Sequence, residues 1–357
     1  MADTKLYLRP VGLLYGATAS AALSSNLALP LAGSALAFTA AELIEGTPRK
    51  AKKRLFPAKD LAASGEPGIS ELLKRVTAKR APFAGLSMKR PLLMGIVNVT
   101  PDSFSDGGLY DTKEEAITHA ATLARAGAGI VDIGGESTRP GSDGVEESDE
   151  LSRVIPVIQG LNGFGAAISI DTRKASVARA AAKAGAKIFN DVSALTYDAD
   201  SLKAAAETGM DVVLMHAKGE PKTMQDDPRY DDVVLEVYDY LEERVATATA
   251  AGIGLDKITI DPGIGFGKTI AHNLALMANL SLFHGLGVPI LLGASRKRFI
   301  GEVSQKNEPR LREPGSHAAA IAAASQGVQM LRVHDVAGTA QALEVWRLAM
   351  TGEAEKR

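Results

Sequence analysis

The sequence predicts an α/β protein in which residues 91–357 form a (β/α)8 TIM barrel, preceded by a small N-terminal extension at residues 1–90. From Pro91 onward, short β-branched and aliphatic runs alternate with Ala-rich, charge-bearing stretches long enough for helices, and the alternation repeats eight times. Eight such units in about 265 residues match the usual size of this barrel. An open doubly wound sheet is the alternative architecture.

Parallel strands need crossover connections, which the helical stretches between the apolar runs would supply. The predicted strands are Leu92–Val97, Ile130–Ile133, Ala167–Ile170, Lys187–Asn190, Asp211–Met215, Ile258–Ile260, Pro289–Leu292 and Met330–Val333. The predicted helices that follow them span residues 113–126, 146–161, 173–184, 200–208, 230–250, 271–283, 295–325 (interrupted) and 336–349.

The extension at residues 1–90 is predicted to be a small α+β or partly ordered region. It contains apolar segments at residues 6–15 and 27–38 and an amphipathic helix at residues 69–79. A basic run at residues 49–54 is interpreted as a solvated linker, with nucleic-acid or partner binding as the alternative. Its role is open: a stabilising cap, an oligomer contact and a partner site all fit.

Composition excludes several classes of function. Forty basic and 42 acidic side chains give a formal charge of -2, so no global field attracts nucleic acid or an anionic membrane. The absence of cysteine excludes disulfides, thiolate metal sites and a cysteine nucleophile. The Ala- and Leu-rich stretch at residues 11–44 is interrupted by Asn26 and Pro30, so it is a poor export signal or membrane span. We therefore predict a cytoplasmic protein without nucleic-acid or membrane partners.

Polar residues gather at the carboxyl ends of the predicted strands. In a (β/α)8 barrel these ends meet at one mouth, where the chemistry takes place. Buried polar groups there need partners or a ligand, because an unpaired buried carboxylate or amide is costly. The residues concerned are Asn98, Asp132, Glu136, Asp171, Asn190, Asp191, His216, Asp261, Ser295, Lys297, Arg332 and His334.

Two long segments resemble the signatures of a known family. Residues 94–108 read MGIVNVTPDSFSDGG and residues 130–141 read IVDIGGESTRPG. They closely resemble the first two signatures of dihydropteroate synthases, which are pterin-binding enzymes. Family-like blocks follow at each later strand: SIDTR (169–173), FNDVS (189–193), MH (215–216), DPGIGFGK (261–268), GASRK (293–297) and RVHDV (332–336). The resemblance covers residues 91–350 and leaves the extension outside.

A pterin has an edge of ring N–H and exocyclic amine, to which one carboxylate can accept two hydrogen bonds. Asp261 is the candidate for this contact. The resemblance implies that Asp261 and Lys297 grip the pterin while Asp171 and Asn190 line its pocket. Apolar surface around the ring would come from Met215 and Phe266.

The resemblance also implies a diphosphate leaving group, which needs cations and hydrogen-bond donors. Arg332 and His334 resemble the family's anion-binding pair, with Arg139 and Asn98 in the same region. Mg²⁺ is the implied cofactor, because a hard cation matches diphosphate oxygens, and Asn98 is its predicted protein ligand. The groups expected to act in catalysis are Lys297, Arg332, His334 and Arg139.

Two polar, glycine-flanked loops at residues 100–108 and 137–144 are interpreted as mobile lids. The family's corresponding loops close over diphosphate and help to form the 4-aminobenzoate site. The resemblance therefore assigns Phe104, Thr138, Arg139 and Pro140 to that closure, with Ser295 meeting the aminobenzoate carboxylate from the other side. Sulfonamides, as aminobenzoate mimics, are expected to inhibit.

The implied reaction condenses 6-hydroxymethyl-7,8-dihydropterin diphosphate with 4-aminobenzoate to give 7,8-dihydropteroate and diphosphate, in folate biosynthesis. The family is typically dimeric, so a homodimer is expected. One alternative is a pterin-binding methyltransferase that serves a corrinoid protein, and another is a catalytically silent pterin-binding paralogue. Residues 263–269 resemble a nucleotide-binding P-loop, but Pro262 stands where that motif needs glycine.

Overall fold

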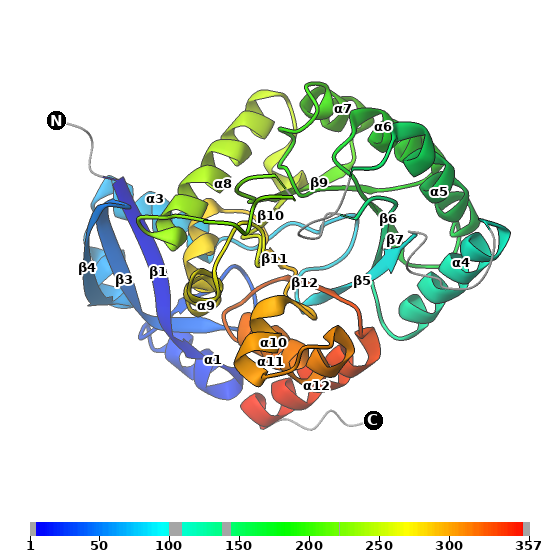
Figure 1. The fold of residues 1–357 in the computed structure, drawn as a ribbon. Coiled ribbons are helices and arrows are strands. Elements are labelled where there is room, and N and C mark those ends of the chain that lie inside the picture. Colours follow the sequence, from blue (N-terminus) through cyan, green and yellow to red (C-terminus); the bar gives the residue numbers. More distant parts are fainter. Residues whose placement is uncertain (1–4, 100–108, 138–143, 221, 353–357) are drawn as a thin grey trace.

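The computed structural model describes residues 5–99, 109–137, 144–220 and 222–352. Eight short strands, nearly all of whose residues are buried, form one parallel sheet in the centre of Figure 1, and helices surround them. The strands are β5 (Leu92–Asn98), β6 (Ile130–Gly134), β7 (Ala167–Asp171), β8 (Ile188–Asp191), β9 (Asp211–Met215), β10 (Ile258–Asp261), β11 (Leu291–Leu292) and β12 (Met330–Val333).

Neighbouring strands in the sheet are consecutive in sequence from β5 to β10, and β12 pairs with both β5 and β11. The two ends of this order, β10 and β11, meet through a single parallel bridge between Ile260 and Ile290. There the amide of Ile260 donates to the carbonyl of Pro289 at 3.0 Å. The sheet therefore closes into the predicted (β/α)8 barrel, and the seam between β10 and β11 is its least hydrogen-bonded junction among the described strands.

The barrel helices are α4 (Leu109–Arg125), α5 (Glu147–Gly160), α6 (Ala175–Ala184), α7 (Ser201–Thr208), α8 (Val233–Ala250), α9 (Ile270–Ala278), α10 (Arg298–Ser304), α11 (Glu313–Ala324) and α12 (Val336–Thr351). Side chains cap several of them: Asp232 accepts from the amides of Val234 and Leu235 at the start of α8, and Thr269 and His272 form a capping box on α9.

Two stretches differ from the sequence prediction. The predicted helix at residues 271–283 ends at Ala278 and continues as the 3-10 helix η3 (Leu280–Leu286). The interrupted stretch at residues 295–325 divides into α10, the 3-10 helix η4 (Pro309–Arg312) and α11. Pro309 and Pro314 each stand in a first turn, where the missing N–H leaves no hydrogen bond unmade.

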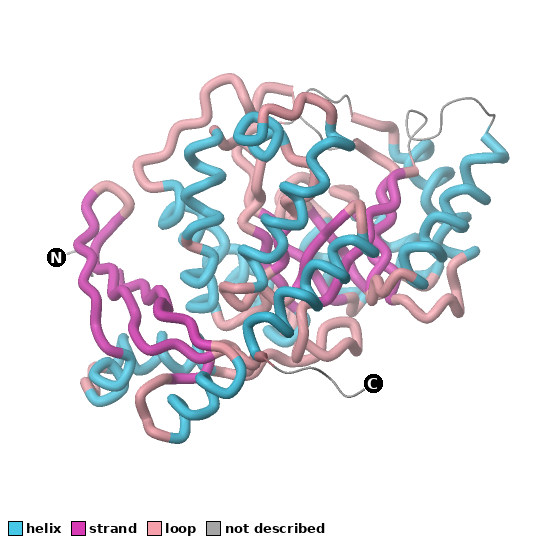
Figure 2. Tube along the Cα trace, turned by 90° about the horizontal axis from the view of Figure 1, so that it is seen from below, coloured by secondary structure: helices cyan, strands magenta, loops and turns pink. Residues whose placement is uncertain are grey.

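The extension forms an antiparallel sheet with helices, beside the barrel in Figure 2. Its elements are β1 (Lys5–Leu14), α1 (Gly16–Ser24), β2 (Leu29–Pro30), β3 (Ala37–Thr47), β4 (Lys50–Pro57), α2 (Ala58–Ala63) and α3 (Pro67–Thr77). One face of the sheet packs on α2 and α3 around Phe38 and Leu43. Tyr7 and Ile44 join the barrel core instead. A domain boundary at residue 90 stays a prediction.

The interpretation of the basic run as a linker is wrong. Residues Lys50–Pro57 form β4, which pairs with β3 from Thr47 opposite Lys50 to Ala40 opposite Pro57. The strand is compatible with its charges because most of its side chains are exposed. Lysines at a sheet edge also discourage unwanted pairing with other strands. Among the described residues, no helix is both long and apolar enough to cross a membrane.

Candidate active site

Arg332 of β12 joins the polar residues of three other strands at the mouth of the barrel. Its Nε donates to Asp132 Oδ2 of β6 at 2.6 Å, and its Nη2 donates to Asp171 Oδ2 of β7 at 2.7 Å. Asn190 of β8 donates from Nδ2 to the same Asp132 oxygen at 3.1 Å. Residues that lie far apart in the sequence therefore form one hydrogen-bonded group.

The electrostatics of this group are those of a buried ion network. Burial raises the pKa of Asp171 to about 7, because the lowering by Arg332 is smaller than the effect of burial and the neighbouring Asp132 carboxylate adds to the rise. Burial opposes the charge of Arg332, but Asp132 and Asp171 raise its pKa above the ordinary value. Arg332 therefore remains a cation, held by two carboxylates.

Asp261 ends β10 and is only 5 % exposed. Its Oδ1 accepts from the amide of Gly263 at 2.7 Å. Burial raises its pKa, whereas the Gly263 amide and the nearby cations Lys297, Lys268 and Arg332 lower it. An ideal Cβ on Gly293 would lie 3.6 Å from Asp261 Oδ2 and 3.9 Å from Arg332 Cβ, so glycine here keeps space open between the two side chains.

Lys297 and Phe266 lie together beside Asp261. The Nζ of Lys297 is 4.0 Å from the centroid of the Phe266 ring, a cation–π contact. The loop that carries Phe266 is fixed by Gln225, which donates to the carbonyl of Gly265 at 2.5 Å, and by Tyr230, which donates to the carbonyl of Gly267 at 2.8 Å. Met215 ends the adjacent β9 and is 4 % exposed.

Ser295 and His334 form a second polar pair. The Ser295 hydroxyl lies 3.0 Å from His334 Nδ1, and it accepts from the His334 amide at 3.3 Å. Asn98 ends β5. Its Oδ1 and Asp171 Oδ2 lie 3.9 and 3.7 Å from the ideal Cβ position of Gly134, so both side chains border the space beside this glycine. The remaining predicted site residues, Phe104, Thr138, Arg139 and Pro140, lie outside the described residues.

Comparison with known proteins bears directly on this arrangement. The family model described as pterin binding enzyme matches residues 94–334. The dihydropteroate synthase of Escherichia coli strain K12 is 47% identical over 278 residues, which cover 78% of this chain and 98% of the relative. The chain belongs to the dihydropteroate synthase family. A family member from Bacillus subtilis is 46% identical over 71% of this chain and 87% of its own length.

Solved structures of dihydropteroate synthases share the fold. A Xanthomonas albilineans enzyme with 4-aminobenzoic acid has a TM-score of 0.71 and 50% identity, covering 76% of this chain and 97% of that chain. The same organism's enzyme in complex with 7,8-dihydropteroate has a TM-score of 0.68 and 48% identity, covering 74% and 95%. A Yersinia pestis family member with a sulfonamide drug complex has a TM-score of 0.70 and 45% identity, covering 74% and 96%.

The sequence assigns no role to Lys268. In the structure it is buried next to Phe266, one of the residues predicted to bind the pterin. Lys268 is 3 % exposed, and its Nζ lies 2.8 Å from His216 Nδ1 and 3.0 Å from the carbonyl of Phe266. Burial lowers the pKa of Lys268 well below its ordinary value, whereas Asp261 raises it. Burial also lowers the pKa of His216, so its neutral ring can accept from Lys268. The only signal in the sequence was that Lys268 ends the Asp-Pro-Gly block.

Asp132 is a second residue of the mouth to which the sequence assigns no role in the site, although it stands at a predicted strand end. It is fully buried and holds both Arg332 and Asn190. Glu136, at the start of the second loop, accepts from Arg173 at 2.6 Å and from Lys174 at 2.8 Å. These carboxylates position the cations and the amide around the mouth.

Oxygen atoms at the mouth suit the hard cation that the family resemblance implies. Asn98 Oδ1 and the Asp171 carboxyl group both border the space beside Gly134. Asp132 Oδ1 and Asp171 Oδ1 are buried without a hydrogen-bond partner among the described residues. Mg²⁺ prefers such oxygen ligands, usually one or two from protein together with phosphate oxygens and water. The donor set therefore fits Mg²⁺.

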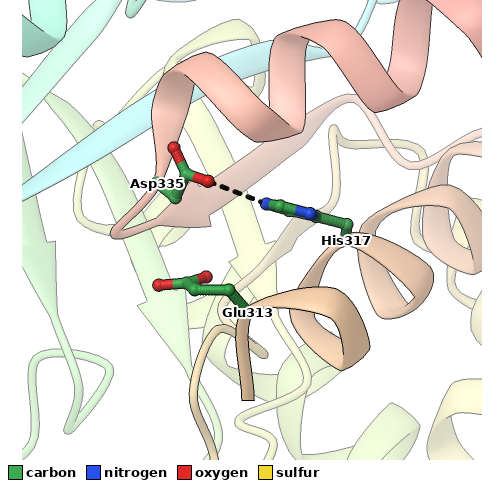
Figure 3. Close-up of side chains that lie close together, drawn as sticks. All are labelled: Glu313, His317 and Asp335. Atoms are coloured by element: carbon green, nitrogen blue, oxygen red, sulfur yellow. Dashed lines mark hydrogen bonds and ion pairs between the residues drawn. The ribbon is translucent and has the colours of Figure 1, made fainter. Parts of the chain in front are cut away.

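A different cluster lies outside the mouth. Within the described residues, Glu313, His317 and Asp335 place one ligand atom each within 4.8 Å of one another (Figure 3). All three have protein partners: His317 Nε2 lies 3.0 Å from Asp335 Oδ2, and Arg296 donates to Glu313. Because Arg296 and Asp335 adjoin Ser295 and His334, the cluster braces two mouth loops.

Proposed function

We propose that this chain performs the dihydropteroate synthase reaction with the mouth residues in the roles that the sequence assigned to them. Membership of the family supports the reaction itself. The arrangement of Asp261, Lys297 and Phe266 supports the pterin site, because a buried carboxylate, a cation and an aromatic ring lie side by side at one end of the barrel.

In the proposed complex, the Asp261 carboxylate accepts hydrogen bonds from the ring N–H and exocyclic amine of the pterin. Burial raises the pKa of Asp261, whereas the Gly263 amide, Lys297 and Arg332 favour the charged form that this contact needs. Asn190 and Asp171 line the same pocket, held by Asp132 and Arg332. Met215 and Phe266 give apolar surface.

The diphosphate would lie against Arg332, His334, Asn98 and Arg139. Two nitrogens of Arg332 already donate to carboxylates, which leaves Nη1 for the leaving group. Mg²⁺, held by Asn98, would supply charge stabilisation on the diphosphate oxygens. Ser295 lies beside His334 and would contact the aminobenzoate carboxylate, with Phe104, Thr138 and Pro140 closing from the lid loops.

The chemistry is a substitution at the pterin methylene carbon. The carbon–oxygen bond to diphosphate breaks first and its electron pair leaves with the diphosphate. The electron-rich pterin delocalises the positive charge, the aniline nitrogen then forms the new carbon–nitrogen bond, and its proton passes to water. No covalent protein nucleophile is needed, so the mouth residues act by orientation and charge stabilisation.

The dihydropteroate assay of the purified full chain tests this function. With pterin diphosphate, 4-aminobenzoate and Mg²⁺, we expect dihydropteroate, and chelation of Mg²⁺ should reduce the rate. Pterin binding without turnover would instead indicate a silent paralogue. Methyl transfer from a reduced folate to a corrinoid protein, without dihydropteroate formation, would indicate the methyltransferase. We further infer a cytoplasmic location, on the sequence grounds given above.

We also propose a homodimer formed through α11 and α12. This face carries a hollow of about 380 Å³ lined by residues that include Ile321, Ala342 and Trp346. Val345 beside it is 64% exposed, which is high for a large apolar side chain. Val345→Lys should convert a dimer to a monomer in light scattering, whereas the same change at the exposed Val303 of α10 should not. A monomeric unmodified chain would contradict the proposal.

A further inference from the structure

Arg80 is a buried cation for which the described residues supply no counter-charge. It follows α3 and is 5 % exposed. Its Nη1 donates to the carbonyls of Arg75 and Ala78 at 2.9 and 3.1 Å, and its Nη2 donates to the carbonyl of His284 at 3.0 Å. No described carboxylate lies within ion-pair distance of Arg80, and its Nε has no hydrogen-bond partner in the part of the chain that the structure describes.

The guanidinium keeps its proton in this setting. Burial lowers the pKa of Arg80 to about 10, so the group still carries its charge at neutral pH. The carbonyls at the end of α3 offer partial negative charge, which favours a cation there. They do not neutralise a full charge, and a buried charge that lacks a counter-ion is costly.

A hollow of about 90 Å³ adjoins Arg80, where the extension meets the start of β5. Two more cations, Lys79 and Lys89, stand on its rim with Ser87, and Gly33 and Met88 belong to its wall. No carboxylate lines it. A Cβ on Gly33 would lie only 2.5 Å from Lys79 Cα, so the absence of a side chain lets the two loops meet here.

The size and charge of the hollow specify its occupant. One enclosed water needs only about 10–15 Å³ of such space, so the hollow has room for several waters or one tetrahedral oxyanion. Three cations and a hydroxyl suit an anion with several acceptor oxygens. Capping of α3 explains the hydrogen bonds of Arg80. It does not compensate the positive charges of Arg80, Lys79 and Lys89 around the hollow.

We infer that this hollow binds a small free oxyanion of the phosphate or sulfate class. The site lies before β5, at the opposite end of the barrel from the carboxyl ends of the strands where Asp261 and Arg332 lie. Arg80 links the end of α3 to η3 through the His284 carbonyl, so an anion beside it would tighten the junction between extension and barrel. The inference is independent of the proposed function.

Thermal unfolding of the full chain in sodium sulfate and in sodium chloride of equal ionic strength tests the inference. Lys79→Gln/Lys89→Gln removes the rim charges and touches no mouth residue. Lys59→Gln/Lys74→Gln removes two other exposed charges of the extension and is the matched control. Sulfate bound at the mouth would raise Tm equally in all three proteins, so the junction site is measured by the difference between them.

At a tenfold excess of sulfate over its dissociation constant, binding at the site should raise Tm by about 2 °C. The unmodified chain and the control variant should show this rise, and Lys79→Gln/Lys89→Gln should not. Equal sulfate gains in the three proteins would overturn the inference. Selenate soaked into crystals should give an anomalous peak between Lys79 and Lys89, and peaks confined to the barrel mouth would also overturn it. Dihydropteroate formation should be unchanged in both double variants.

Discussion

Arg332 donates to Asp132 through Nε at 2.6 Å, so the cation of β12 is fixed to a fully buried carboxylate of β6 on the other side of β5. The same guanidinium also holds Asp171 at 2.7 Å. One side chain therefore binds two carboxyl groups and sets the positions of the groups around the proposed pterin pocket.

Arg332→Met should lower both stability and activity. It would leave Asp132 and Asp171 buried without their cation, and breaking such an ion pair from one side costs about 3 to 5 kcal/mol. Urea unfolding measures the loss. Arg298→Met is the control, because Arg298 makes an exposed pair with Glu302 and its loss should cost at most about 1 kcal/mol. Equal stability of the two variants would contradict the network.

Asp261→Asn should weaken binding of the pterin diphosphate about 100-fold, because an amide cannot accept two charge-assisted hydrogen bonds from the pterin edge. Calorimetric titration checks this. Asp256→Asn changes an exposed carboxylate three residues after Ile253 and should bind normally. Normal affinity in Asp261→Asn would remove this residue from the pocket.

His284 should make the protein sensitive to acid. Burial, together with the nearby Arg80, lowers its pKa to about 3, whereas the unfolded chain has a pKa near 6.5. Between these values the unfolded state binds the extra proton, so stability falls as the pH drops below about 6.5, by about 1.4 kcal/mol per pH unit. The free energy of unfolding of His284→Gln should lack this slope. Parallel pH curves for the two proteins would show that His284 does not contribute.

Tyr7→Ala should destabilise the chain by about 3 to 5 kcal/mol. Tyr7 is fully buried, and its ring meets that of Tyr238 on α8 edge to face at a centroid distance of 5.2 Å. Tyr7→Phe removes only the hydrogen bond to Asp239 and should cost about 1 kcal/mol. If Tyr7→Ala left the unfolding of the barrel unchanged, the extension would not act as a cap on it.

Sulfonamides should inhibit by competing with 4-aminobenzoate. The first of the two predicted lid loops reads Ser103-Phe104-Ser105, with no obvious insertion beside the phenylalanine, and the Yersinia pestis family member has been solved with a sulfonamide drug complex. The half-inhibitory concentration should rise in proportion to 4-aminobenzoate and not to the pterin substrate. An inhibition curve that stays flat at high sulfonamide concentration would exclude inhibition by sulfonamides.

The strand order could be predicted because each β-branched run is short and stands between helical stretches, and the predicted Asp211–Met215 and Met330–Val333 are the observed bounds of β9 and β12. The strand before Gly293 was predicted from Pro289 but forms only at Leu291–Leu292, since at the seam the barrel pairing is reduced to one bridge. The strand β4 could not be predicted from residues 49–54, because the exposed lysines of this edge strand do not alternate with apolar residues.

The mouth itself was predictable from strand ends, but the partners within it were not. Nothing in the sequence says that Arg332 meets Asp132, about 200 residues away, because that contact depends on β12 pairing with β5 and β5 with β6. Lys268 was hidden for a related reason. A lysine is normally solvated, and only the folded loop shows that it is enclosed against His216.

The seam between β10 and β11 links ligand binding to the closure of the barrel. Asp261 ends β10 and Lys297 follows β11, so the two groups proposed to hold the pterin lie on either side of the junction that has the fewest backbone hydrogen bonds among the described strands. A pterin bound by both residues would connect β10 and β11 across this junction. Substrate binding would thus help to keep the barrel closed. In the unliganded enzyme, local opening of the sheet would be greatest at the β10–β11 junction.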